Sequence, residues 1–286
     1  IEYTLSLSIR DGHTYQDEAT LFKQTSRLLT EPEIQSTLYI HLKRCLKEME
    51  TEKQVIRQGD KVFQPRLYQE EEFISIWTKQ RMRVPSSPIK PKWKKQLKTF
   101  EKEEGIQFSE EQREAIFSAA SHTMFILTGG PGTGKTTLLK GFLASIEEEK
   151  IKVKLAAPTG RAAKRMEEMS GRKAFTLHRL LEYNPQDQSF IKNDDSPINA
   201  NYVVVDEASM IDTSLMAGLM KAISPSTRLI LVGDKDQLPS VGPGMVLGDL
   251  LELHKLPKVV LNRIFRQEAN SDIPYNAHRI LNGQMP

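Results

Sequence analysis

Short apolar runs alternate with amphipathic stretches through the second half of the chain. Runs with the length of buried strands lie at residues 124–127, 153–157, 202–206, 228–232 and 259–261. Between them, apolar residues recur at helical spacing over residues 137–146, 160–169, 214–223 and 246–253. This alternation predicts the α/β class, with a parallel sheet and helices on both of its faces.

The first 84 residues have a different pattern, in which helices dominate. Apolar spacing predicts helices over residues 18–29, 34–50 and 67–81. A turn at Gly59-Asp60 between two short apolar pairs predicts a hairpin. Helices followed by a small hairpin are the pattern of a winged helix, which often binds nucleic acid. The same pattern fits a spacer that packs against the second region, and the sequence leaves both open.

Residues 85–100 are rich in proline and lysine and separate the two regions. Prolines favour a stiff, extended chain, so we expect a linker between an N-terminal domain at residues 1–84 and a second domain at 101–286. Lysines around Trp93 could contact a nucleic-acid backbone, but a solvated linker is the favoured interpretation. Ser109 and Gln112 have the spacing of a capping box, which predicts that a helix begins there.

The candidate chemistry begins directly after the strand at 124–127, where the chain reads T-G-G-P-G-T-G-K-T-T. Four of these residues fit the phosphate-binding pattern G-x-x-x-x-G-K-[ST], and the strand before and the helix after supply its context. Loop N–H groups and the helix N-terminus would face the phosphates of ATP. Lys135 is expected to reach the β- and γ-phosphates, and the Thr136 hydroxyl to hold Mg²⁺. The predicted nucleotide-binding residues are Gly130, Pro131, Gly132, Thr133, Gly134, Lys135, Thr136 and Thr137.

Other polar residues also follow strands, and parallel sheets bind ligands at the carboxyl ends of their strands. Asp206 is expected to help hold Mg²⁺, and Glu207 to act as the general base that polarises the attacking water. Gln237 has the reach to hydrogen-bond a γ-phosphate, although by itself it is better explained as part of a polar turn. Arg266 follows the last strand, where an arginine could stabilise developing charge.

The segment Pro158-Thr159-Gly160-Arg161 follows the strand at 153–157 and begins a helix. Thr159 and the helix N-terminus could hold a backbone phosphate, with Arg161 adding charge. A capped amphipathic helix explains the same residues equally well. His178 is similarly open, because a lone histidine is usually structural.

Composition mainly excludes classes of protein. A length of 286 residues fits two domains. The net charge of only +3 means that any nucleic-acid surface must be a local patch. The single cysteine, Cys45, excludes a disulfide framework and a cysteine-based zinc site. No apolar stretch has the length of a membrane span and no signal peptide is visible, so a cytoplasmic location without a membrane partner is expected.

The motifs, taken in order, resemble those of superfamily 1 helicases. These motifs are T-G-G-P-G-T-G-K-T-T, A-P-T-G-R-A-A, T-L-H-R-L-L, V-V-V-D-E-A-S-M, L-V-G-D-K-D-Q-L-P-S-V-G-P-G and I-F-R-Q. They are most similar to those of the RecD-like DNA helicases, which travel 5′ to 3′ on single strands. The resemblance is strong over residues 108–267, and upstream D-G-H-T-Y and F-Q-P-R-L-Y resemble the region before the motor in longer RecD-like proteins.

The resemblance implies a RecA-like ATPase domain that uses ATP and Mg²⁺ and has single-stranded DNA or a duplex junction as its partner. It implies that Gln112 reads the adenine base, that Gln237 couples the γ-phosphate to DNA, and that Arg266 is a finger-like arginine. The residues expected on the single-strand track are Pro158, Thr159, Gly160, Arg161 and His178. A small duplex-splitting hairpin, which the family also carries, would fall within residues 184–201.

Such helicases also need a second RecA-like domain, and no second series of strands and helices follows Gln267. The chain is therefore expected to be the N-terminal region and first motor domain of a longer ATP-dependent DNA helicase. ATP binding should survive in the chain alone, hydrolysis is left open, and unwinding is not expected. A nucleotide-dependent nucleic-acid clamp and an RNA helicase are the alternatives.

Overall fold

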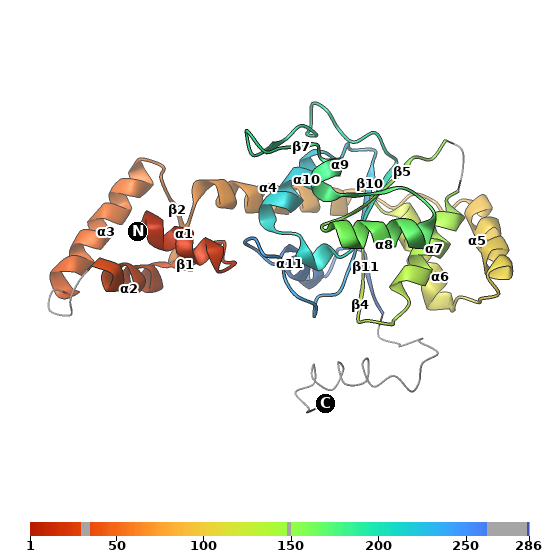
Figure 1. Ribbon diagram of the computed structural model, residues 1–286, viewed down its shortest axis with the longest axis horizontal. Coiled ribbons are helices and arrows are strands. Elements are labelled where there is room, and N and C mark those ends of the chain that lie inside the picture. Colours follow the sequence, from red (N-terminus) through yellow and green to blue (C-terminus); the bar gives the residue numbers. More distant parts are fainter. Residues whose placement is uncertain (30–34, 148–149, 262–284, 286) are drawn as a thin grey trace.

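A six-stranded parallel sheet forms the centre of the second region (Figure 1). The computed structural model describes residues 1–29, 35–147, 150–261 and 285. The strand order is β11-β4-β10-β9-β5-β6, and every neighbouring pair is parallel. The strands are β4 (Met124–Gly129), β5 (Val153–Ala157), β6 (Ala174–Thr176), β9 (Tyr202–Val205), β10 (Arg228–Gly233) and β11 (Lys258–Leu261). The sheet confirms the predicted fold class, and every strand predicted for this region is present.

Alternate residues of the central strands point to opposite faces of the sheet and form two apolar cores. Met124 and Ile126 of β4 belong to one core, and Phe125 and Leu127 belong to the other. A strand buried on both faces must be apolar throughout, which is why these strands read as continuous apolar runs. The first core is covered by α9 (Leu177–Leu180), α10 (Thr213–Lys221) and α11 (Val246–Glu252), and the second by α6 (Glu110–Ser121), α7 (Lys135–Ser145) and α8 (Gly160–Ser170).

The N-terminal residues form a separate lobe at one end of the molecule (Figure 1). Its elements are α1 (Glu2–Arg10), β1 (Tyr15–Asp17), α2 (Glu18–Leu29), α3 (Gln35–Thr51), β2 (Ile56–Gln58) and β3 (Lys61–Phe63). The predicted hairpin is β2–β3, and Gly59 in its turn has φ 65°, a conformation that glycine adopts readily. β1 pairs with β3 and was not predicted, because three residues are too few to show an alternating pattern. Whether the lobe binds nucleic acid or serves as a spacer stays a prediction.

Helix α4 (Pro65–Arg83) runs from the N-terminal lobe onto the region of the six-stranded sheet (Figure 1). Ile74 and Trp77 belong to the first core of the sheet. The buried Arg81 guanidinium donates hydrogen bonds to the carbonyls of residues 223, 224, 225 and 227 at 2.7 to 3.4 Å. Burial lowers the pKa of Arg81. The two regions are therefore joined by a helix that packs against the first core of the sheet.

The prediction of an extended linker at residues 85–100 is wrong from residue 91 onward. Residues Pro91–Glu103 form helix α5, with Pro91 in its first turn, where the missing N–H would have no partner within the helix. Trp93 and Leu97 are 2% and 1% exposed and belong to the second core. Trp93 is therefore a core residue and is too deeply buried to stack on a base.

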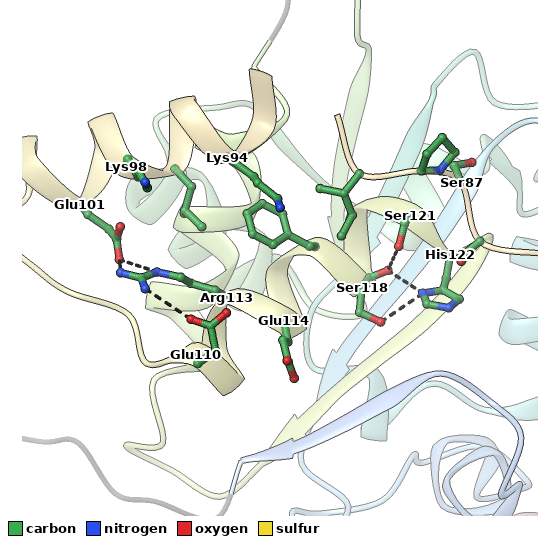
Figure 2. A pocket seen from close by; sticks show the side chains of 15 residues that line it. Ser87, Lys94, Lys98, Glu101, Glu110, Arg113, Glu114, Ser118, Ser121 and His122 are labelled. Carbon is green, nitrogen blue, oxygen red and sulfur yellow. Dashed lines mark hydrogen bonds and ion pairs between the residues drawn. The ribbon is translucent and has the colours of Figure 1, made fainter. Parts of the chain in front are cut away.

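An open hollow of about 930 Å³ lies between α5, α6 and residues 86–89 (Figure 2). Arg113 meets Glu101 at 2.9 Å and Glu110 at 3.6 Å on one side of it. On the other side, Ser118 Oγ lies 3.1 Å from His122 Nδ1 (Figure 2). None of the residues predicted to bind ATP or DNA lines this hollow, so it is separate from the candidate site.

Candidate nucleotide-binding site

The loop between β4 and α7 has the backbone of a phosphate-binding loop. Gly132 and Gly134 have φ values of 78° and 88°, which side chains with a Cβ rarely adopt. A Cβ at Gly129 would lie 2.7 Å from the Leu261 carbonyl oxygen, so only glycine allows β11 to approach here. Gly134 directly precedes α7, and the free N–H groups of that helix open into the loop. The loop can therefore surround an anion.

Lys135 is the first residue of α7 and lies inside this loop. Its Nζ donates hydrogen bonds to the carbonyls of Gly129 and Gly130, the second at 2.9 Å. Burial lowers the pKa of Lys135, and the nearby carboxylates of Asp234 and Asp206 act in the opposite direction. The site thus pairs one cation with two carboxylates.

Asp234 is a further acidic residue of the site that was not predicted from the sequence. It is only 3% exposed. Its Oδ1 accepts a hydrogen bond from the Asp236 N–H at 3.1 Å. Asp234 directly follows β10, just as Asp206 directly follows β9. An acidic residue at the end of an apolar strand was therefore the signal that could have found it.

Asp206 is positioned by its own turn at the end of β9. Its Oδ1 accepts a hydrogen bond from the Glu207 N–H at 2.9 Å. Burial raises the pKa of Asp206, against the opposing effects of that hydrogen bond and of Lys135 and Arg165. The upward direction means that the cost of burying the charge exceeds these attractions.

Glu207 directly follows Asp206, and its side chain contacts the segment predicted to bind DNA. Its backbone has φ 54°, which is unusual for a residue with a side chain. Oε2 accepts a hydrogen bond from Thr159 Oγ1 at 3.5 Å, and Oε1 lies 3.7 Å from Arg165 Nη1. The Thr159 hydroxyl also caps α8, where it accepts from the Ala162 N–H at 3.2 Å.

The predicted track residues follow two adjacent strands. Pro158, Thr159, Gly160 and Arg161 come after β5, and His178 comes after β6. Ala157 pairs with Thr176 in the sheet, so both segments lie at the same edge. Arg161 and His178 are exposed there.

A small hairpin, β7 (Tyr183–Asn184) and β8 (Ser189–Phe190), follows α9 and overlaps the segment in which a hairpin was expected. The His178 ring meets the edge of the Tyr183 ring at a centroid distance of 5.3 Å. Phe190 packs so closely on α10 that a Cβ at Gly218 would lie 2.5 Å from its ring. The hairpin is therefore anchored at its base by aromatic contacts.

Neither Gln112 nor Gln237 has a hydrogen bond to Lys135 among the contacts of the described residues. The Gln112 side chain completes the predicted capping box, where Oε1 accepts from the Ser109 N–H at 2.9 Å. Gln237 is exposed in the loop after β10, and its N–H donates to the Asp234 carbonyl at 3.2 Å. Arg266 lies outside the described residues. The roles expected of these three stay predictions.

The donor set fits a nucleotide with Mg²⁺. In phosphate sites this ion usually takes one or two protein ligands and completes its shell with phosphate oxygens and water. The exposed Thr136 hydroxyl at the start of α7 and the Asp206 carboxylate are oxygen donors of that kind. In the described part of the chain, no cluster of three or more His, Cys, Asp or Glu side chains could hold a metal by itself.

No helix among the described residues has both the length and the apolar character to cross a membrane.

Replacing Asp206 with asparagine is expected to stabilise the nucleotide-free chain by about 1 kcal/mol, because it removes a buried charge and keeps the shape of the side chain. For a chain of this size that corresponds to a rise in Tm of about 2–4 °C. Thermal unfolding without ATP or Mg²⁺ measures it, with the exposed Asp194→Asn as the control.

The sign of the pH dependence follows from the raised pKa of Asp206. Below the unfolded value of about 4, both states are protonated and the substitution changes nothing. As the pH rises from there, the unfolded chain releases the proton while the native carboxyl still holds it, so the gain from asparagine grows and then levels off above the folded pKa. A gain that does not vary with pH, or a loss at neutral pH, would contradict the assignment.

Comparison with known proteins gives consistent matches over this region. A family model described as an AAA domain matches residues 112–243. The chain is 43% identical over 178 residues to the ATP-dependent RecD2 DNA helicase of Deinococcus radiodurans, covering 62% of this chain and 24% of that protein. It is 42% identical over 167 residues to the RecBCD enzyme subunit RecD of Mycolicibacterium smegmatis, covering 50% of this chain and 30% of that one.

Among solved structures, the Pif1 helicase from Candida albicans matches with a TM-score of 0.46 and 22% identity, over 63% of this chain and 45% of that one. The chain spans 24% and 30% of the length of the two curated relatives described. The family model covers every predicted site residue except Arg266.

Proposed function

We propose that this chain is part of a RecD-like superfamily 1 DNA helicase, that it binds ATP with Mg²⁺, and that it links that site to a single-stranded DNA track. The observation that carries the proposal is the position of Glu207. It directly follows Asp206, and its carboxylate meets Thr159 at 3.5 Å and Arg165 at 3.7 Å. Glu207 thus links the two sites, because its backbone N–H holds the Asp206 carboxylate at 2.9 Å while its side chain meets the track residue Thr159.

The nucleotide side of the site would act mainly by charge and position. Lys135 and the N–H groups of the loop bind the phosphates, and Thr136 and Asp206 hold Mg²⁺. When bound, the ion neutralises charge on the β- and γ-phosphates. Glu207 orients the attacking water and accepts its proton, the role of a general base.

The track side of the site explains why DNA should promote hydrolysis. In the structure, one oxygen of the Glu207 carboxylate accepts a hydrogen bond from Thr159 and the other is paired with Arg165. A DNA phosphate at the N-terminus of α8 would draw the Thr159 hydroxyl and the Arg165 guanidinium toward itself. Glu207 then has both oxygens free for water. DNA binding would in this way activate the base.

The full-length enzyme would complete the cycle. We propose that a second RecA-like domain closes the cleft, that Gln112 reads the adenine, and that Gln237 and Arg266 respond to the γ-phosphate. Hydrolysis then drives 5′ to 3′ movement. The proposal extends to a longer protein because the matched part is only 24% and 30% of the two relatives.

A titration of labelled oligo-dT into the chain, with and without ATP–Mg²⁺, tests this function. Thr159→Val combined with Arg161→Gln is expected to weaken DNA binding about tenfold and to lower the salt slope by about 0.7 for each phosphate that is no longer bound. ATP affinity should stay unchanged. Lys140→Gln on α7 is the charge-matched control, and equally weakened binding in both variants would place the track elsewhere.

Two further measurements separate the alternatives. An oligoribonucleotide of the same length that binds more tightly than oligo-dT would favour an RNA helicase, because the 2′-hydroxyl is what distinguishes the two strands. ATP-driven displacement of a strand by the full-length protein excludes a stationary clamp. Salt-sensitive binding without displacement would support the clamp instead.

A further inference from the structure

A second basic surface lies at the edge of the sheet, beside β6. A groove of about 850 Å³ there is lined by residues from several separate segments. Its cations are Lys152, Lys154, Arg172, Lys173, Arg179 and Lys192. Glu182, the carboxylate in its lining, is paired with Lys192 at 3.5 Å. In a chain whose net charge is only +3, this is a strong local concentration of positive charge.

Three of the cations surround one aromatic ring. Lys154 and Lys173 each lie 5.4 Å from the centre of the Phe175 ring, and Arg179 lies 5.7 Å from it. Phe175 is partly buried and packs against the first core, so the ring holds these side chains in place. Among the ion pairs of the described residues, none joins these three cations to a carboxylate, whereas Arg172 is paired with Glu147 at 2.8 Å.

Like charges held around one ring repel one another, and an anion between them removes that cost. Cations from separate segments along one groove suit a ligand with repeated negative charges, such as a phosphate backbone. A single phosphate would use only part of the groove. The charge pattern therefore points to a polyanionic strand.

The groove is distinct from the track at the carboxyl ends of the strands. Lys152 and Lys154 lie at the beginning of β5, whereas Thr159 follows its end. At about 3.3 Å per residue, Lys152 and Thr159 are roughly 20 Å apart. The groove therefore begins away from the track and approaches it only at Arg179, which is next to His178.

The hairpin β7–β8 stands at one end of the groove. Glu182 directly precedes β7, and Lys192 follows β8 by two residues. Arg179 is on α9, next to His178, whose ring contacts the hairpin. A DNA strand that separates from its complement at this hairpin would therefore lie next to the groove.

We propose that this basic groove binds the phosphate backbone of the DNA strand that leaves the duplex beside the hairpin, while the other strand follows the track. The inference rests on the proposed function, because it assumes that the chain works at a junction of duplex and single strands. It adds a second DNA site, made from Lys154, Lys173 and Arg179 around Phe175.

Two DNA probes test the groove. One is a duplex with a single 5′ arm, and the other is a fork that also has a non-complementary 3′ arm. Fluorescence anisotropy over a series of salt concentrations gives the affinity and the salt slope for each. The wild-type chain is expected to bind the fork more tightly and with a steeper slope.

The groove variant combines Lys154→Gln, Lys173→Gln and Arg179→Gln. It is expected to lose about 10–100-fold in affinity for the fork, and its salt slope should fall by about 2, or about 0.7 for each single-strand phosphate contact. Affinity for the single-armed probe and for ATP–Mg²⁺ should not change. The matched control is Lys94→Gln, Lys95→Gln and Lys102→Gln on α5, which removes three positive charges from exposed positions that do not line the groove.

Each result decides the question. An equal fall in fork affinity for the groove and control variants would mean general charge attraction and would overturn the proposal. So would a fork affinity that the groove substitutions leave unchanged, or a groove that an acidic peptide occupies in preference to the fork. A wild-type chain that binds the single-armed probe but gains nothing from the second arm overturns the groove alone. A chain that binds ATP but neither probe overturns the proposed function as well.

Discussion

Replacing Lys135 with alanine is expected to weaken ATP–Mg²⁺ binding by about 10²–10³-fold. A cation 4 Å from a phosphate charge contributes about 4 kcal/mol at the effective dielectric constant of a protein surface, and each 1.4 kcal/mol is about tenfold in affinity. Asp234 and Asp206 both act on Lys135, so removing the cation also leaves two carboxylates near the triphosphate. Titration calorimetry with ATP and Mg²⁺ measures the loss of affinity.

The control for this prediction is Lys140→Ala, which removes the same charge from the same helix beyond the loop. It should bind ATP like the wild-type chain. Thermal unfolding of both variants without nucleotide shows whether the fold is intact. If Lys135→Ala retained its ATP affinity in a folded chain, the loop would not be the phosphate site.

The motor fold could be predicted because its strands are buried on both faces. Residues such as Met124 and Phe125 of β4 serve opposite cores, so the whole strand must be apolar and is visible as a run. The loop between β4 and α7 was visible for a related reason. Its glycines and Lys135 are consecutive in sequence, and their function depends on local backbone geometry.

The composition of residues 85–100 does not distinguish an extended linker from a helix that begins at Pro91. Proline is as compatible with the first turn of a helix as with an extended chain. The decisive feature is that Trp93 and Leu97 are four residues apart and share one helix face, which is buried. Lysines cover much of the rest of the helix, and their number favours a solvated linker.

Contacts between segments distant in sequence could not be predicted at all. Glu207 meets Thr159 because β9 lies next to β5 in the sheet, although the chain forms β6 and a hairpin between them. The groove around Phe175 depends on the same arrangement. Its cations are scattered through about 40 positions of sequence, and only strand order brings them together.

Replacing Glu207 with glutamine is expected to leave ATP–Mg²⁺ affinity unchanged and to lower DNA-stimulated ATP turnover by the full-length enzyme about 10²–10⁴-fold, the usual contribution of a general base. Glutamine keeps the size of the side chain and can still meet Thr159, but it accepts no proton from water. Calorimetry gives the affinity and a phosphate-release assay gives the turnover.

Glu168→Gln is the control, because Glu168 is an exposed carboxylate on α8 whose ion pair with Lys164 is solvated. It should have wild-type turnover. Arg165→Gln separates the base from its partner: it frees the Glu207 carboxylate from the contact at 3.7 Å, so turnover without DNA should rise while the stimulation by DNA falls. If Glu207→Gln kept full turnover, another group would activate the water. If Arg165→Gln left the DNA-free rate unchanged, DNA would have to stimulate hydrolysis by a route other than the release of Glu207.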